Sequence, residues 1–316
     1  MVHLTSPFSS PAWLSDLLRR HRDSYEPDYH GYLTDHLPMM LLAMHGLGAD
    51  QTTIESRGQR YVRRLDPIED SALQTITRVD DGMGKRRAYR ALVRFFDGEI
   101  DRTGIEETLA VYLPKFISGW VRHAFHGTIR LAYGIRFNVE SEISAGLAYL
   151  ASAGPDGRLE RIGLGATKAD RFAWPPSIDI ASRRFDNRYE EVLLADTFAV
   201  HTHVLENNEQ RVAEEVLGLF NHTQGFFALH MVTGMHALGI CTEAINENVD
   251  GLMNAGVAAA YLAIDAPMFI QSAKARPIHM DFAHAVKVAF SCLDQAQRLN
   301  STRFREASET YGRSFT

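Results

Sequence analysis

Two long stretches of the sequence, residues 226–242 and 251–264, contain no charged residue and follow helical spacing. A helix that crosses a membrane needs about 20 apolar residues, and both stretches are shorter than that. A helix that is apolar on every side must then be surrounded by other parts of a folded protein. We therefore expect two buried helices of a cytoplasmic protein, and no membrane span.

Helical spacing also dominates the rest of the chain, and we find neither a hairpin signal nor alternation of polar and apolar residues. The expected helices cover residues 11–22, 36–46, 85–100, 105–117, 121–151, 190–205, 210–220, 226–245, 251–270 and 281–299. The stretch near 153–176 is rich in Gly and Pro, which predicts a long surface loop. The pattern predicts an all-α fold with one large multi-helix domain over residues 1–316.

The charge balance excludes some classes of partner. Lys and Arg total 33 and Asp and Glu total 39, so the net charge is −6. A mildly acidic chain lacks the positive surface that binds nucleic acid or an anionic membrane. Residues 1–22 contain no apolar run of a secretory signal, and the two cysteines, Cys241 and Cys292, lie in apolar stretches. We expect both thiols to be reduced in the core.

Several catalytic motifs do not occur in the sequence. There is no Gly-x-Gly-x-x-Gly after a strand, no Walker loop, no Gly-x-Ser-x-Gly and no His-Glu-x-x-His. The Glu-x-x-His pairs of di-iron helical bundles do not occur either. A metal site in this chain would have to be built mainly from histidines that lie far apart in the sequence.

Two of the 14 histidines, His230 and His236, lie inside the uncharged stretch 226–242. A buried imidazole without a partner is unfavourable, so each needs a hydrogen bond or a metal. Residues six positions apart face different sides of a helix, so at most one of the pair faces any one site unless Gly234 distorts the helix. The two histidines are either hydrogen-bonded core residues or include a metal ligand.

A polar stripe follows the last predicted helix, where His284, Lys287, Ser291 and Asp294 share one side. The stripe is either a solvated face or the wall of an internal cavity, with Lys287 close to a metal.

A second stripe holds His126, Arg130 and Tyr133. It is either a half-exposed helix edge or a pocket wall where Arg130 or Tyr133 steers a polar substrate. His36 opens an apolar helix for which Asp35 is the expected N-cap. We expect the following histidines at the surface: His3, His21, His30, His201, His203, His222 and His279.

Taken together, four segments resemble the questin oxidase-like family. They are Asp-His-Leu-Pro at 35–38 with Leu-Leu-Ala-Met-His-Gly-Leu-Gly-Ala at 41–49, then 126–134, 229–237 and 281–287, in the family's order. The resemblance implies an all-helical enzyme, an oxygenase that oxidises an aromatic, quinone or polyketide-like substrate with O2. The reaction is then Baeyer-Villiger-like or ring-cleaving. This chain has Met39-Met40 where many fungal members have two histidines, so its substrate pocket differs from theirs.

The resemblance also implies a mononuclear non-heme iron in a buried, histidine-lined cavity, with a lysine that can be carboxylated, and NADPH as an external reductant. Carried onto this chain, the candidate ligands are His36, His126, His230 or His236, His284 and a carboxylated Lys287. Arg130 and Tyr133 are the candidate catalytic residues.

These residue types are suitable ligands for iron, because iron binds imidazoles well. Fewer than six protein ligands would leave coordination positions open for O2 and substrate. The expected pocket walls are Met39, Met40, Phe125, Phe226 and Phe227. Two other functions stay open. One is a non-catalytic helical protein that binds an apolar ligand, and the other is a metal-dependent hydrolase.

Overall fold

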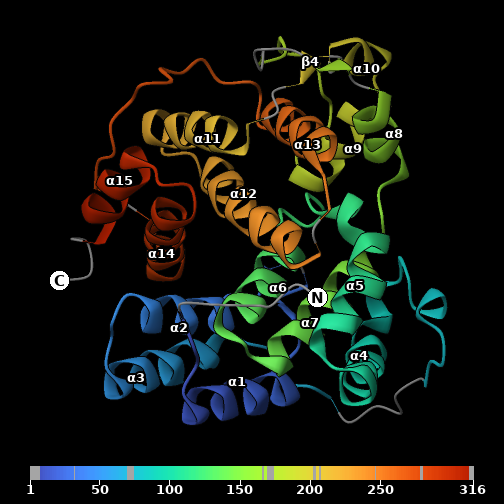
Figure 1. The fold of residues 1–316 in the computed structure, drawn as a ribbon, viewed down its shortest axis with the longest axis vertical. Helices are drawn as coiled ribbons and strands as arrows, with labels where there is room; N and C mark the ends of the chain where they lie inside the picture. The colour runs from blue at the N-terminus through green and yellow to red at the C-terminus, as the bar shows by residue number, and fades with distance from the viewer. Residues whose placement is uncertain are drawn as a thin grey trace.

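Helices make up almost all of the regular structure (Figure 1). The computed structural model describes residues 8–31, 33–69, 75–165, 167–168, 174–201, 204–205, 208–245, 247–277 and 280–312. The prediction of an all-α fold is confirmed. None of the helices in these ranges is long and apolar enough to cross a membrane.

The helices of the first half are α1 (Ala12–Ser24), α2 (Leu37–Gly46), α3 (Gln51–Tyr61), α4 (Tyr89–Thr103), α5 (Ile105–Phe116), α6 (His126–Phe137), α7 (Glu140–Ala153) and α8 (Gly157–Gly165). Those of the second half are α9 (Phe185–Leu194), α10 (Asp196–His201), α11 (Glu209–Thr223), α12 (Phe226–Ile245), α13 (Asp250–Ala263), α14 (Phe282–Arg298) and α15 (Thr302–Gly312). Short 3-10 turns are η1 (Val62–Arg64), η2 (Val79–Asp81), η3 (Arg86–Ala88) and η4 (Ile117–Gly119).

The described residues also include two pairs of very short strands. β1 (Asp28–Tyr29) pairs antiparallel with β2 (Leu33–Thr34), and β3 (Thr167–Lys168) pairs parallel with β4 (Val204–Leu205). The β1–β2 hairpin leads directly into α2.

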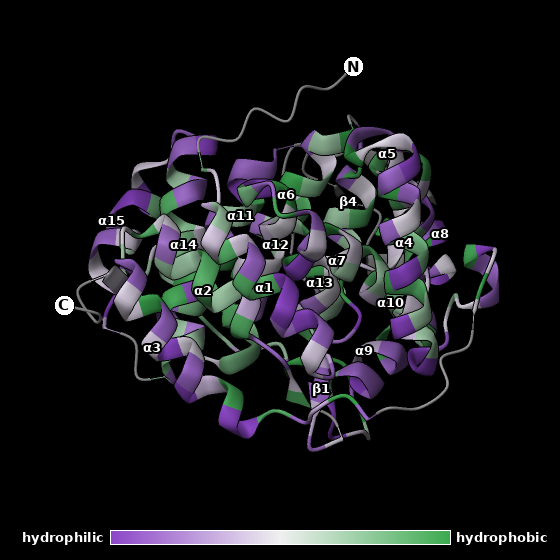
Figure 2. Ribbon diagram, turned by 90° about the horizontal axis from the view of Figure 1, so that it is seen from below, coloured by the Kyte–Doolittle hydropathy of each residue, from purple (hydrophilic) through white to green (hydrophobic). Residues whose placement is uncertain are grey.

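The helices α6, α7 and α12 pack closely in the middle of the molecule (Figure 1). Glycines permit this approach, because a Cβ atom at Gly146 would lie 2.4 Å from Cα of Leu131, and one at Gly234 would lie 2.5 Å from the ring of Phe125. α12 and α13 are buried along most of their length, as the uncharged stretches predicted. Outer helices such as α1 carry hydrophobic and hydrophilic residues side by side (Figure 2).

Several predicted boundaries are wrong. The single helix expected over 121–151 is divided into α6 and α7, because Asn138 adopts a left-handed conformation with φ of 52°. The helix expected to reach residue 270 ends at Ala263, just before Asp265 and Ala266 with positive φ. The loop expected over 153–176 contains α8, and α3 and α15 were not predicted.

The fold brings the N-terminal ends of α2, α6, α12 and α14 to one place. His36 is the N-cap residue of α2, and His126 is the first residue of α6. His230 is the fifth residue of α12, and His284 is the third residue of α14. Asp281 caps α14 as predicted, because its carboxylate accepts hydrogen bonds from the amides of residues 283 and 284.

Candidate metal centre

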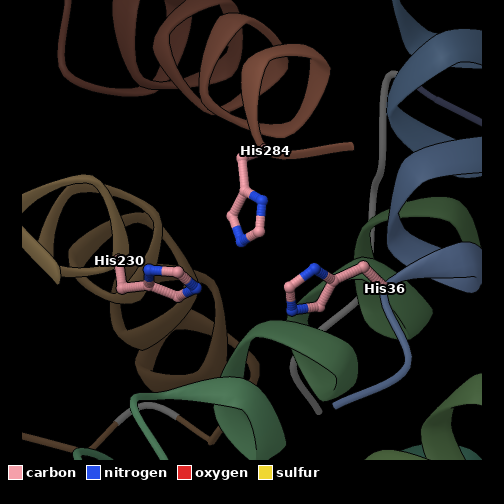
Figure 3. Close-up of side chains that lie close together, drawn as sticks. All are labelled: His36, His230 and His284. Carbon is pink, nitrogen blue, oxygen red and sulfur yellow. The ribbon is translucent and has the colours of Figure 1, made fainter. Parts of the chain in front are cut away.

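Three buried imidazoles face one another in the interior: His36, His230 and His284 (Figure 3). Their candidate ligand nitrogens all lie within 4.8 Å of one another. The exposed fractions of the three residues are 8%, 0% and 5%. Residues from three separate parts of the sequence thus form a single cluster of nitrogen atoms.

His126 is the fourth member of this cluster. Its Nε2 atom lies 2.7 Å from Nε2 of His36, and its ring centre lies 4.9 Å from that of His230. Phe125, which precedes it, has a left-handed backbone with φ of 69° and turns the chain into α6. We call these four residues, His36, His126, His230 and His284, the histidine cluster.

The outer nitrogens of three rings are held by neighbouring acceptors. Nδ1 of His126 donates to the carbonyl of His123 at 2.5 Å, and Nδ1 of His230 donates to that of Phe226 at 2.8 Å. Nδ1 of His284 donates to the carboxylate of Asp281. Each of these bonds places the lone pair on Nε2, toward the interior of the cluster. Metal-bound histidines are oriented in this way.

Two of the inward nitrogens, Nε2 of His230 and Nε2 of His284, have no hydrogen-bond partner among the described residues. A buried polar atom without a partner costs about 1–3 kcal/mol, and two in one cluster are unusual. Their position opposite the other two imidazoles is that of ligands aimed at a common cation.

Burial keeps the cluster uncharged. Desolvation lowers the pKa of His126 to about 3 and those of His36 and His230 well below the usual value, with smaller effects from neighbouring positive groups. The pKa of His284 is also lowered by burial, in spite of Asp281. The positive ends of four helix dipoles act in the same direction. Neutral imidazoles are the form that binds metals.

Lys287 lies one turn after His284 on α14 and is completely buried. Its Nζ atom has no hydrogen-bond partner among the described residues. Burial lowers the pKa of this amine to about 7, although Asp281 and Asp35 act against the shift. A large fraction of Lys287 is therefore a neutral amine at neutral pH.

A family model described as Questin oxidase-like matches residues 33–221, which is more than half of the chain. The chain belongs to the Questin oxidase-like family. It is also similar to a Baeyer-Villiger oxidase, notM, of Aspergillus sp. (strain MF297-2), with 28% identity over 164 residues. That alignment covers 48% of this chain and 35% of the relative, so the chain matches about a third of the relative's length.

In this member of the family the matched region contains His36 and His126, whereas His230, His284 and Lys287 follow it in the sequence. The fold brings the histidines of the matched region close to those that follow it in the sequence. His236, the other histidine of α12, lies outside the cluster. Its Nε2 atom lies 2.7 Å from the carboxylate of Asp294, which also accepts hydrogen bonds from Arg136.

The polar stripe on α14 is buried, and the solvated-face interpretation is wrong. Lys287, Ser291 and Asp294 are all 0% exposed, and Asp294 bonds to Arg136 of α6 and to His236 of α12.

The second stripe is buried too, and so is not a half-exposed edge. Arg130 donates to Glu142 at 2.7 Å and to the hydroxyl of Tyr89 at 3.2 Å. The Tyr133 hydroxyl donates to the carbonyl of Lys287 at 3.3 Å. Arg130 and Tyr133 do not line the cavity beside the cluster. Their contacts join α6 to the neighbouring helices, which does not support the predicted steering of substrate.

A cavity of about 640 Å³ leads to His36, His126 and His284. Its aromatic wall consists of Tyr29, Tyr61, Tyr149, Phe185, Phe226 and Phe227. Phe226 and Phe227 were predicted to line a pocket, and they do. Met39, Met40 and Phe125 are buried in the core instead. The cavity therefore has aromatic side chains and three of the cluster histidines in one lining.

Sequence reasoning missed one pair close to the cluster. His21 was expected at the surface, but it is buried and its Nε2 lies 2.6 Å from the carboxylate of Asp35. It follows Leu14 and Leu18 at helical spacing, and that spacing could have placed it on the inner face of α1. His30 and His222 are exposed as expected. His3, His203 and His279 lie outside the described residues, as does the side chain of His201.

Proposed function

We propose that this chain is an oxygenase that uses O2 to oxidise a small aromatic, quinone or polyketide-like substrate at an iron ion held by the histidine cluster. One observation carries the proposal: the buried Nε2 atoms of His230 and His284 have no hydrogen-bond partner among the described residues, and they lie beside the imidazoles of His36 and His126. Membership of the Questin oxidase-like family and the name of the Baeyer-Villiger oxidase relative support the oxidative chemistry.

The donor set fits a mononuclear iron ion. Four neutral imidazoles suit iron and need no thiolate, and they leave coordination positions open. The iron would activate O2, which otherwise reacts only slowly with organic substrates. His36, His126, His230 and His284 are the proposed ligands. His236 is excluded from this set because Asp294 holds it elsewhere.

Lys287 is the proposed site of carboxylation. Only a neutral amine adds to CO2, and burial supplies that form of Lys287 near neutral pH. The product would carry a negative charge, which the same burial disfavours unless a cation lies beside it. A carboxylated Lys287 therefore depends on a metal in the histidine cluster, and it would contribute an oxygen ligand to it.

The remaining residues of the site bind the substrate and orient the imidazoles. The aromatic wall of the cavity offers stacking surfaces for a flat ring. Asp281 and the carbonyls of His123 and Phe226 hold the rings in place. Insertion of one oxygen atom from O2 leaves the other to be reduced to water, and we propose NADPH as the external source of those electrons.

Metal analysis of the purified chain without a histidine tag tests the proposal. We expect close to one iron per chain in the wild type and in a control, His222→Ala, whose side chain is exposed on α11. Iron should be lost from a His126→Ala, His284→Ala double variant. Uptake of O2 with a panel of quinones and NADPH should follow the iron content.

Two other results would overturn the oxygenase. Zinc bound at one per chain and lost from the double variant would favour a metal-dependent hydrolase. No bound metal after anaerobic purification and reconstitution with Fe²⁺ would favour a non-catalytic protein that binds an apolar ligand.

A further inference from the structure

The mouth of the cavity carries positive charge that its own acidic residues do not neutralise. Each of the three lining carboxylates already has a partner. Asp28 pairs with Arg86 and accepts a hydrogen bond from Tyr149 at 2.9 Å. Asp186 lies 3.4 Å from Nδ1 of His123.

The third carboxylate, Asp281, caps α14 and holds His284. Two other lining residues, Arg64 and Arg183, have no carboxylate within ion-pair distance among the described residues. Both side chains are exposed at the rim. The lining contains four arginines (Arg64, Arg86, Arg183 and Arg184) and three carboxylates, so its formal surplus is one positive charge, and Arg64 and Arg183 are the guanidinium groups at the rim that no described carboxylate pairs with.

Arg64 is connected to the histidine cluster through one side chain. Its guanidinium carbon lies 4.6 Å from the ring centre of Tyr61, which is a cation–π contact. The hydroxyl of the same tyrosine accepts a hydrogen bond of 3.0 Å from the backbone amide of His36. One tyrosine side chain therefore lies between the guanidinium of Arg64 and the backbone of His36.

We propose that the substrate is an aromatic compound with an anionic group, a carboxylate or an ionised phenol, which Arg64 and Arg183 recognise at the rim while its ring lies against the aromatic wall. The inference rests on the proposed function, since it names the substrate class of the same cavity. Guanidinium groups bind carboxylates and phenolates through charge-assisted hydrogen bonds. The two arginines are specificity residues and take no part in the chemistry at the histidines.

A matched pair of ligands tests the proposal: anthraquinone-2-carboxylate and anthraquinone-2-carboxamide, which differ in charge and hardly in shape. Isothermal titration calorimetry of the full iron-loaded chain gives the two dissociation constants without turnover. We expect the carboxylate to bind roughly tenfold more tightly than the amide, as one charge-assisted contact provides. The preference should shrink at high salt, because the guanidinium groups are exposed.

The double variant Arg64→Gln, Arg183→Gln should reduce the preference to about one and leave the affinity for the amide unchanged. The matched control is Arg158→Gln, Arg305→Gln, which removes the same charge from two exposed sites outside the cavity and should keep the preference. A preference that survives the first double variant would place the carboxylate elsewhere, at the histidines, and overturns the proposal.

Equal affinities in the wild type, or no binding of the carboxylate, overturn it as well. These results are separate from a failure of the oxygenase itself. Iron content and O2 uptake decide the oxygenase, and the difference between the two ligands decides the anionic substrate.

Discussion

Replacing Lys287 by Met should stabilise the metal-free protein. The side chain of Lys287 is 0% exposed and its Nζ atom has no hydrogen-bond partner among the described residues. Met has nearly the same volume and shape, so the packing of α14 against its neighbours is kept. The substitution therefore removes the burial of an amine and little else.

The magnitude follows from the pKa. Burial lowers the pKa of Lys287 from 10.5 to about 7, and each tenfold change in proton affinity is worth about 1.4 kcal/mol. At pH 7 the amine then lowers the free energy of unfolding by on the order of 4 kcal/mol. Between pH 7 and 10.5 the unfolded chain binds more protons than the folded one, so wild-type stability rises with pH. At pH 9 the difference from the variant should fall to about 2 kcal/mol.

Urea unfolding followed by tryptophan fluorescence measures this difference. The protein is stripped of metal with a chelator and kept in bicarbonate-free buffer, so that Lys287 is neither bound nor carboxylated. Lys274→Met, at an exposed site, is the control and should leave the free energy of unfolding unchanged. The reasoning is refuted if Lys287→Met is no more stable than the wild type at pH 7, or if the difference is the same at pH 9.

Three further substitutions test the packing of the helices and the place of His236. Gly146→Ala should lower the free energy of unfolding by about 1–3 kcal/mol, because the new Cβ meets the backbone of Leu131 and separates α7 from α6. Gly98→Ala, with open space around it on α4, should instead be neutral or stabilise slightly in the same urea titration. His236→Asn should cost about 1–3 kcal/mol by disturbing the buried bond to Asp294, yet leave bound iron unchanged in metal analysis. Loss of iron in that variant would contradict the separation of His236 from the cluster.

Local signals were sufficient where one helix decides the outcome. α12 begins and ends where the prediction placed it, because its apolar stretch is long and bounded by a glycine and polar residues. The start of α14 was also predicted, since an Asp at the N-cap satisfies amides that are otherwise free. The four cluster histidines were all among the candidates, because the resemblance to the family implied them as ligands.

Features that depend on residues outside the helix could not be predicted in the same way. The break between α6 and α7 depends on a left-handed Asn138, which no apolar periodicity reveals. The roles of Arg130 and Tyr133 depend on Glu142 and on a carbonyl of α14, and these partners are known only from the fold. A polar side chain on an apolar helix predicts that a partner exists, and not which partner it is.

One further residue, Gly234, could have decided between His230 and His236 from the sequence. Gly234 is the position where α12 touches Phe125, so its side of the helix faces the start of α6. At about 100° per residue, His230 lies only about 40° from Gly234 around the helix axis, whereas His236 lies about 160° away. A glycine amid large apolar residues often marks the closest contact of a helix. Had Gly234 been interpreted in this way, His230 would have been placed beside His126, and His236 on the opposite side of α12, where Asp294 holds it.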